Sequence, residues 1–219
     1  MIGRNMIKNA ERIGVYGRSG SGKSTYVKEL LKNNNRVIVF DPLDEYCELK
    51  GFIKAKTITD VKQMMRNRWA IGFKIAYLPT SGYEAECMHN LCKLLLQAQS
   101  LYKTGKDKRI ITLVIEEMNL SFPDTKLPQK FNGFPEVCSR GRHYGIAVIG
   151  VSQRMAEVNT RFRGNCVRTI LFPLQDHTDI TTAVKIISPT NKSKLQNLKN
   201  HHYMVYENGQ VSFGKNSLK

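Results

Sequence analysis

The sequence has 219 residues, 41% of them hydrophobic, which suits a globular domain with a sizeable core and excludes a disordered chain. Its 34 lysines and arginines outnumber 18 aspartates and glutamates, and the formal net charge of +16 favours a polyanionic partner, nucleic acid first and an acidic membrane surface second. Since no apolar run reaches the roughly 18–20 residues of a membrane span, and the N-terminus lacks a signal peptide's apolar core, we expect no intrinsic membrane span.

Apolar runs alternate with helical patterns along the chain. The runs predict strands at 12–17, 36–41, 71–78, 109–117, 145–152 and 166–172. Between them, we predict helices at 23–32, 59–69 (capped by Thr59), 84–102, 133–143 and 155–163. Two short helices and a hairpin at 202–214, turning at Asn208-Gly209, follow. This order predicts an α/β fold: a single domain over 1–219 with a mainly parallel central sheet, helices on both faces and a C-terminal β-hairpin.

The cysteines are odd in number, scattered and without a CxxC pair, which favours a reducing compartment. Cys87 and Cys92 flank His89, but no second ligand pair follows at zinc spacing. We interpret Cys87, His89 and Cys92 as residues on different faces of one helix and not as metal ligands. The remaining cysteines are Cys47, Cys138 and Cys166.

The first strand runs directly into Gly-Arg-Ser-Gly-Ser-Gly-Lys-Ser at 17–24, which is the pattern of a phosphate-binding loop in its required place between a strand and a helix. The glycines let the backbone aim its N–H groups at phosphate oxygens, and the helix start adds a positive dipole end. We expect Lys23 to neutralise the β- and γ-phosphates of ATP and Ser24 to coordinate Mg²⁺. The predicted nucleotide contacts are Gly17, Arg18, Ser19, Gly20, Ser21, Gly22, Lys23, Ser24 and Thr25.

An acidic pair, Glu116 and Glu117, follows the apolar run 110–115. At the end of a strand both side chains can reach the crevice where nucleotides bind, so we assign Glu116 to the metal and Glu117 to the attacking water. Gln153 follows another apolar strand and is predicted near the γ-phosphate, where its amide orients the water or senses the phosphate. The alternatives are an exposed strand end for the acids and a polar cap for the glutamine.

These elements, in this order, resemble the FtsK–HerA superfamily of hexameric DNA-pumping P-loop ATPases. Asp41-Pro-Leu-Asp-Glu-Tyr46 is similar to the family's D-P-x-x-E-Y signature. Ser139-Arg-Gly-Arg-His-Tyr-Gly-Ile146, running into VIGVSQR, is similar to its basic helix and sensor strand. The resemblance covers about 12–187. It implies ATP and Mg²⁺ as cofactors, and it implies that the phosphate loop is a Walker A motif and the acidic pair a Walker B motif.

We expect none of the membrane, DNA-reading or barrel domains that larger members of this superfamily carry. A bare motor of this size resembles the genome-packaging ATPases of membrane-containing double-stranded DNA viruses. Many motors of the family have Asp-Glu where this chain has Glu116-Glu117, a departure that affects the geometry of the site.

The resemblance also implies an arginine that enters the neighbouring subunit's site in a ring, of which a hexamer is favoured and a pentamer is the alternative. Arg142 is preferred for this role and Arg140 is second. Arg154 and Arg168 are further candidates, and Asp41 and Glu45 would shape the site or the subunit contact. The alternative for the first two is a basic helix face, and for DPLDEY an ordinary turn.

A motor without sequence preference should contact DNA phosphates through lysine and arginine. One candidate group is Lys126 and Lys130, on a loop that could face a central pore. A second is Lys103, Lys106, Lys108 and Arg109. The alternative for both is a solvated charged surface.

The sequence favours an ATP-driven double-stranded DNA translocase that packages a viral genome into a preformed capsid. Such a protein would act in the host cytoplasm and at the packaging vertex of the virion, with capsid or membrane-vertex proteins as partners. The alternatives are a cytoplasmic HerA-like translocase, a conjugation or secretion ATPase resembling zonula occludens toxin-like proteins, and a monomeric nucleotide switch or small-molecule kinase.

Overall fold

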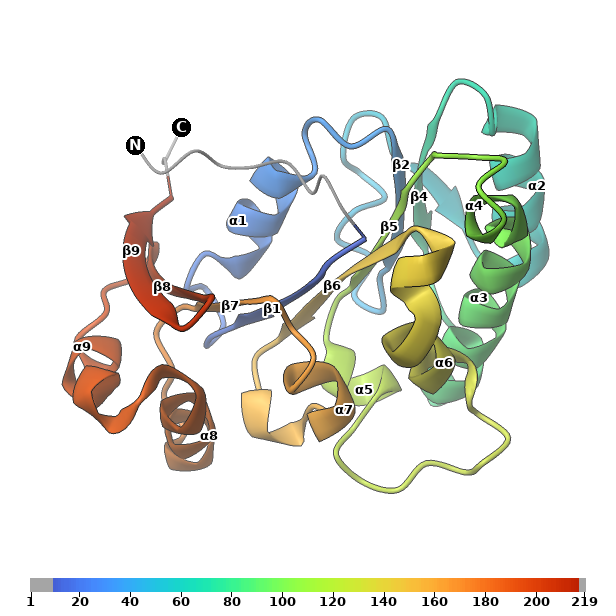
Figure 1. Cartoon of the computed structure of the whole chain (residues 1–219). Helices are drawn as coiled ribbons and strands as arrows, with labels where there is room; N and C mark the ends of the chain where they lie inside the picture. The colour runs from blue at the N-terminus through green and yellow to red at the C-terminus, as the bar shows by residue number, and fades with distance from the viewer. Residues whose placement is uncertain (1–9, 217–219) are drawn as a thin grey trace.

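A computed structural model describes residues 10–216 of the chain. Within them, nine strands form one sheet in the order β3-β4-β2-β5-β6-β1-β7-β8-β9 (Figure 1). The pairings from β3 to β7 are parallel, and β8 and β9 add an antiparallel hairpin, so the predicted mainly parallel sheet is confirmed. The strands are β1 (Arg12–Tyr16), β2 (Arg36–Phe40), β3 (Ile53–Ala55), β4 (Phe73–Tyr77), β5 (Ile111–Ile115), β6 (Ile146–Ser152), β7 (Arg168–Leu171), β8 (His202–Glu207) and β9 (Gln210–Lys215).

Helices cover both faces of the sheet, as predicted. Figure 1 shows α1 on one face and α2, α3 and α6 on the other. The α-helices are α1 (Lys23–Leu30), α2 (Ile58–Arg68), α3 (Glu84–Ala98), α4 (Ser100–Lys103), α5 (Met118–Ser121), α6 (Gly133–Arg140), α7 (Thr160–Arg163), α8 (His177–Ile187) and α9 (Lys192–Gln196). Short 3₁₀ turns are η1 (Gly141–Tyr144), η2 (Met155–Glu157) and η3 (Pro189–Asn191).

Successive residues of the central strands enter opposite cores. In β2, Ile38 and Phe40 pack on the α3 side, while Val37 and Val39 pack on the α1 side. All four are fully buried. This alternation is why the strands read as continuous apolar runs, and it places their polar carboxyl ends at one edge of the sheet.

The predicted cap of α2 was wrong. Thr57, not Thr59, precedes the helix: its hydroxyl accepts from the Asp60 N–H at 3.1 Å, and the Asp60 carboxylate accepts from the Thr57 N–H at 2.8 Å. Thr59 lies inside the helix because it has no acidic partner three residues on to close this capping box. The edge strand β3 was not predicted, since three residues that include Lys54 carry no apolar run.

Three predicted helices are interrupted. The helix predicted at 84–102 breaks at Gln99, whose buried side chain donates to the Arg109 and Gly145 carbonyls at 2.9 and 3.2 Å. The helix at 133–143 divides into α6 and η1, and the helix at 155–163 into η2 and α7. The last of these divisions has a side-chain cap, since the Asn159 carboxamide oxygen accepts from the Arg161 N–H at 3.0 Å and so begins α7.

Cys87 and Cys92 both lie on α3, as predicted. All five cysteines are free. Among the described residues, no helix combines the length and apolar character that crossing a membrane requires.

Candidate nucleotide site

A polar cavity of about 310 Å³ opens at the carboxyl ends of β1, β2, β5 and β6. Its walls bring together the phosphate loop, both residues of the acidic pair, Gln153 and parts of the DPLDEY segment. The loop residues that line it are Ser19, Gly20, Gly22, Lys23, Ser24 and Thr25. The structure brings these predicted residues together because each group follows a central strand, and the carboxyl ends of parallel strands meet at one edge of the sheet.

The phosphate loop has the backbone geometry that its glycines allow. Gly20 and Gly22 adopt φ angles of 68° and 108°, which favour glycine. Lys23 is only 8% exposed, and its ammonium donates to the Arg18 carbonyl at 3.1 Å. Burial lowers the pKa of Lys23, while the neighbouring carboxylates Glu117 and Glu116 oppose that shift. The ammonium is thus held at the N-terminus of α1. A bound phosphate would replace the Arg18 carbonyl as its hydrogen-bond acceptor.

The DPLDEY segment is a turn built around Asp41. The fully buried Asp41 carboxylate accepts from the backbone N–H groups of Glu45 and Tyr46 at 3.1 and 2.8 Å. Burial raises the pKa of Asp41, and these two hydrogen bonds oppose the rise. The turn directs the buried Tyr46 hydroxyl onto Glu116, where it donates to Oε1 at 2.6 Å. The sequence did not predict this contact between Tyr46 and Glu116, although the motif that contains Tyr46 was identified.

Glu116 is a buried carboxylate, 6% exposed. Burial raises its pKa to about 7; the Tyr46 hydrogen bond lowers it, and the nearby Glu45, Glu117 and Asp41 raise it. A buried carboxylate is costly unless a cation pairs with it. Together with the Ser24 hydroxyl on the same cavity, it forms an oxygen donor set that Mg²⁺ accepts. These residues fit a Mg²⁺ site.

This burial predicts a stability change in Glu116→Gln, which keeps an oxygen for the Tyr46 hydroxyl. The pKa of this carboxyl is 4.5 in the unfolded chain and about 7 in the folded protein. As the pH rises from one value to the other, the unfolded chain gives up the proton first, so the free energy of unfolding falls. In EDTA, we expect the variant to gain on the order of 3 kcal/mol at pH 8 but about 1 kcal/mol at pH 5. Urea unfolding at both pH values measures this.

The matched control is Glu45→Gln, which changes an exposed carboxylate on the same cavity and should give a far smaller pH-dependent difference. Equal gains for Glu116→Gln at pH 5 and pH 8 would contradict a charge origin.

Glu117 adopts a left-handed backbone conformation, φ 41° and ψ 55°, between β5 and α5. This conformation is strained for glutamate, and such strain clusters at functional sites. Gln153 donates from Nε2 to Glu117 Oε1 at 2.8 Å. Gln153 therefore orients the carboxylate that we assign to the water, a contact that strand-end reasoning did not foresee.

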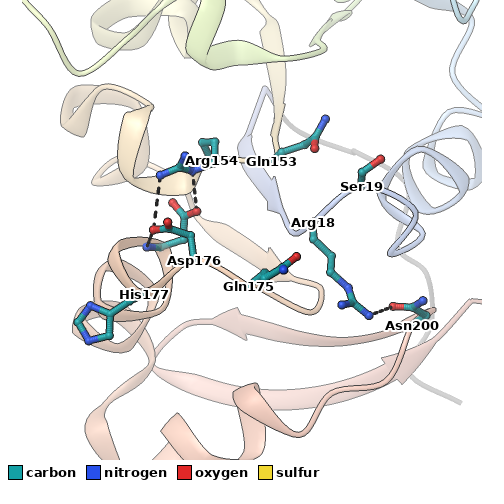
Figure 2. A pocket seen from close by; sticks show the side chains of 9 residues that line it. Arg18, Ser19, Gln153, Arg154, Gln175, Asp176, His177 and Asn200 are labelled. Atoms are coloured by element: carbon teal, nitrogen blue, oxygen red, sulfur yellow. Dashed lines mark hydrogen bonds and ion pairs between the residues drawn. The ribbon is translucent and has the colours of Figure 1, made fainter.

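A second cavity of about 670 Å³ adjoins the first and shares Ser19 and Gln153 with it (Figure 2). Arg154 lies on its wall and is held by acidic side chains: Asp179 at 3.0 Å, Glu157 at 3.1 Å and Asp176 at 3.4 Å. These ion pairs show that Arg154 supports the loop after β6.

Arg140 and Arg142 lie at the other edge of the sheet. They precede β6, and Gln153 follows it, so the seven-residue strand separates them from their own site by roughly 20 Å. Arg140 pairs with Glu136 at 3.2 Å, whereas Arg142 is exposed and has no ion pair within residues 10–216. Arg168 pairs with Glu207 at 2.9 Å. Arg142 is thus exposed and lies far from the nucleotide site of its own chain.

The two lysine groups lie at opposite edges. Lys126 and Lys130 are exposed on the loop between α5 and α6, at the edge that carries the nucleotide site. Lys103, Lys106, Lys108 and Arg109 precede β5 at the far edge. Arg109 is already paired with Asp107 at 2.6 Å and packs over the Trp69 ring.

Solved structures share this fold at low sequence identity. The genome packaging NTPase B204 from Sulfolobus turreted icosahedral virus 2, in complex with AMPPCP, has a TM-score of 0.74 and 19% identity over 95% of this chain and 98% of that chain. VirB4 of Thermoanaerobacter pseudethanolicus has a TM-score of 0.64 and 13% identity, over 97% and 90% of the two chains. The bacterial conjugative coupling protein TrwB has a TM-score of 0.64 and 12% identity, over 96% and 85%.

No curated protein sequence matches the chain at a significant level. The model of a protein family does: the helicase HerA central domain matches residues 6–128, more than half of the chain. That segment contains the phosphate loop, the DPLDEY turn and the acidic pair. The resemblance found in the sequence is confirmed, and the chain belongs to the HerA central-domain family of P-loop ATPases.

Proposed function

We propose that the chain is a Mg²⁺-dependent ATPase motor that drives double-stranded DNA into a preformed viral capsid, with its full length forming one motor domain. The observation that carries the proposal is the cavity in which Lys23, Glu116, Glu117 and Gln153 meet. Similarity along almost the whole length of a viral genome packaging NTPase, at the higher TM-score among the structures compared, supports the viral assignment.

The geometry supports a division of labour in hydrolysis. The phosphate loop and Lys23 bind the β- and γ-phosphates, while Ser24 and Glu116 hold Mg²⁺, which supplies charge neutralisation on the phosphate oxygens when bound. Glu117 accepts the proton of the attacking water, and Gln153 fixes the position of that carboxylate. A neighbouring subunit supplies Arg142 to the charge that develops on the transferring phosphoryl group.

The charge distribution supports DNA as the transported substrate. Lys126 and Lys130 are exposed on the loop between α5 and α6, at the edge of the sheet that carries the nucleotide site. Hydrolysis at that site could therefore move this loop and the DNA bound to it. The overall charge of +16 supplies the non-specific attraction that a sequence-independent motor needs. The packaging vertex of the virion, with capsid or membrane-vertex proteins, is the proposed place of action.

Steady-state ATP hydrolysis at low salt, with and without linear double-stranded DNA, tests this function. We expect DNA to stimulate hydrolysis several-fold, and we expect the stimulation to fall steeply as salt rises because phosphate contacts release counterions. The double variant Lys126→Ala/Lys130→Ala should lose most of the stimulation but keep the basal rate. Lys103→Ala/Lys106→Ala, which removes equal charge at the far edge, is the matched control.

Hydrolysis that is indifferent to DNA at all salt concentrations would contradict the motor and favour the monomeric switch. If both double variants lost DNA stimulation equally, the loop that carries Lys126 and Lys130 would not be the specific DNA contact. The structural similarity to VirB4 and TrwB keeps a conjugation or secretion pump as the second candidate. Defective packaging in a virus that carries Glu117→Gln would favour the first candidate over the second.

A further inference from the structure

The C-terminal hairpin is bonded directly to the phosphate loop, although nearly the whole chain separates them. The backbone N–H of His201 donates to the Ser21 carbonyl, and the Asn216 side chain donates from Nδ2 to the Gly22 carbonyl, both at 2.8 Å. Arg18 donates to the Asn200 Oδ1 at 2.9 Å (Figure 2). These contacts come from the residues that flank β8 and β9, so the hairpin is more than a sheet edge.

The two ends of the hairpin also hold each other against Gly22. The N–H of Asn216 donates to the His201 carbonyl at 2.8 Å, and Asn216 is only 3% exposed. A Cβ added at Gly22 would lie 2.7 Å from Asn216 Nδ2 and 2.9 Å from His201 Nδ1. His201 itself adopts a left-handed φ of 65°. The hairpin thus packs on the phosphate loop as closely as a glycine permits.

The sheet order indicates which half of a nucleotide faces the hairpin. The acidic pair follows β5 and Gln153 follows β6, and both strands lie on one side of β1. The strands β7, β8 and β9 lie on the other side. Because the γ-phosphate must lie next to Glu117, the phosphate chain runs across the loop and leaves the nucleoside on the hairpin side.

His201 is the hairpin residue that reaches this place. It lines the 310 Å³ cavity together with Gly22 and Thr25. Its Nδ1 is buried and has no hydrogen-bond partner within the described structure, while the residue as a whole stays partly exposed. Nδ1 packs against Gly22, so what this imidazole offers a base or ribose is its flat face for stacking and its other ring nitrogen, Nε2, for a hydrogen bond.

We propose that His201 contacts the nucleoside half of the bound nucleotide, which makes the β8–β9 hairpin a part of the nucleotide site. The inference rests on the nucleotide binding in the proposed function and adds a specificity residue to it. It also gives the hairpin a role. Its hydrogen bonds to the Ser21 and Gly22 carbonyls connect the contact at His201 with the phosphate loop, so nucleotide binding and release would change both together.

Calorimetric titration with Mg·ATP and with Mg·tripolyphosphate, which lacks the nucleoside, tests this contact. His201→Asn removes the ring but tolerates the left-handed backbone. We expect its affinity for ATP to fall about tenfold and its affinity for tripolyphosphate to stay unchanged. His202→Asn, at the adjacent residue outside the cavity, is the matched control and should bind both ligands as the wild type does.

Wild-type affinity for ATP in His201→Asn would overturn the inference. An equal loss for ATP and tripolyphosphate would also overturn it, because His201 would then only support the loop. His201→Gly, which also tolerates this φ, replaces the first variant if that one fails to fold. Failure of the wild type to bind either ligand would instead overturn nucleotide binding itself, and with it the proposed function.

Discussion

Glu117→Gln is expected to lower the rate of ATP hydrolysis by about 10²–10⁴-fold while nucleotide affinity stays within a few-fold of the wild type. The amide keeps the size of the side chain and an oxygen that can accept from Gln153 Nε2, so the local structure is preserved. What it loses is the ability to accept a proton from water. The effect should therefore fall on kcat and not on binding.

Single-turnover hydrolysis and calorimetric ATP titration separate the two effects. Glu45→Gln, on the same cavity, is the matched control and should retain most of the rate, because no side chain among residues 10–216 holds the Glu45 carboxylate as Gln153 holds that of Glu117. A Glu117→Gln variant that hydrolyses ATP at the wild-type rate would remove Glu117 from the mechanism. Glu116 would then have to be examined as the base.

The parts of the site that the sequence revealed are those encoded locally. The phosphate loop needs glycines at fixed positions between a strand and a helix, so the sequence of residues 17–25 is enough to predict its conformation. Glu116, Glu117 and Gln153 were found because they end apolar runs, and a parallel sheet brings such ends to one edge. The fold class followed from the same alternation of apolar runs and helical patterns.

The parts that the sequence did not reveal depend on distant contacts. The Tyr46 hydroxyl meets Glu116 across 70 positions, and Asn216 meets Gly22 across 194. No periodicity encodes such pairs, because they depend on how strands order themselves in the sheet. The left-handed backbone of Glu117 was hidden for another reason: nothing in a Glu-Glu pair distinguishes a strained residue from a relaxed one.

Local errors had local causes. Thr59 and Thr57 stand two positions apart, and only the second has Asp60 at the third position beyond it. At the break after α3, the Gln99 side chain donates to the carbonyls of Arg109 and Gly145, which lie just before β5 and β6. Asp60 marks the cap in the sequence itself, whereas the contacts of Gln99 depend on the tertiary structure.

Arg142→Ala is expected to lower hydrolysis by the assembled ring about 10³-fold or more, and to leave the monomer's nucleotide affinity unchanged. Arg142 is exposed, unpaired within the described residues and at the edge of the sheet away from its own phosphate loop. It can act on a phosphoryl group only in a neighbour. Arg140→Ala is the matched control, since Arg140 pairs with Glu136 on its own helix and should retain most of the rate.

Mixing two inactive variants gives the decisive measurement. Arg142→Ala subunits keep their own phosphate loop and Glu117 but have no arginine to offer, and Glu117→Gln subunits offer the arginine but lack the base. If the arginine acts in trans, a mixed ring contains interfaces with both groups, and hydrolysis should recover beyond that of either variant alone. Unrecovered activity in rings shown to be mixed would contradict the trans assignment. Recovery would show that a single subunit holds only part of the active site, which is why hydrolysis would require the ring.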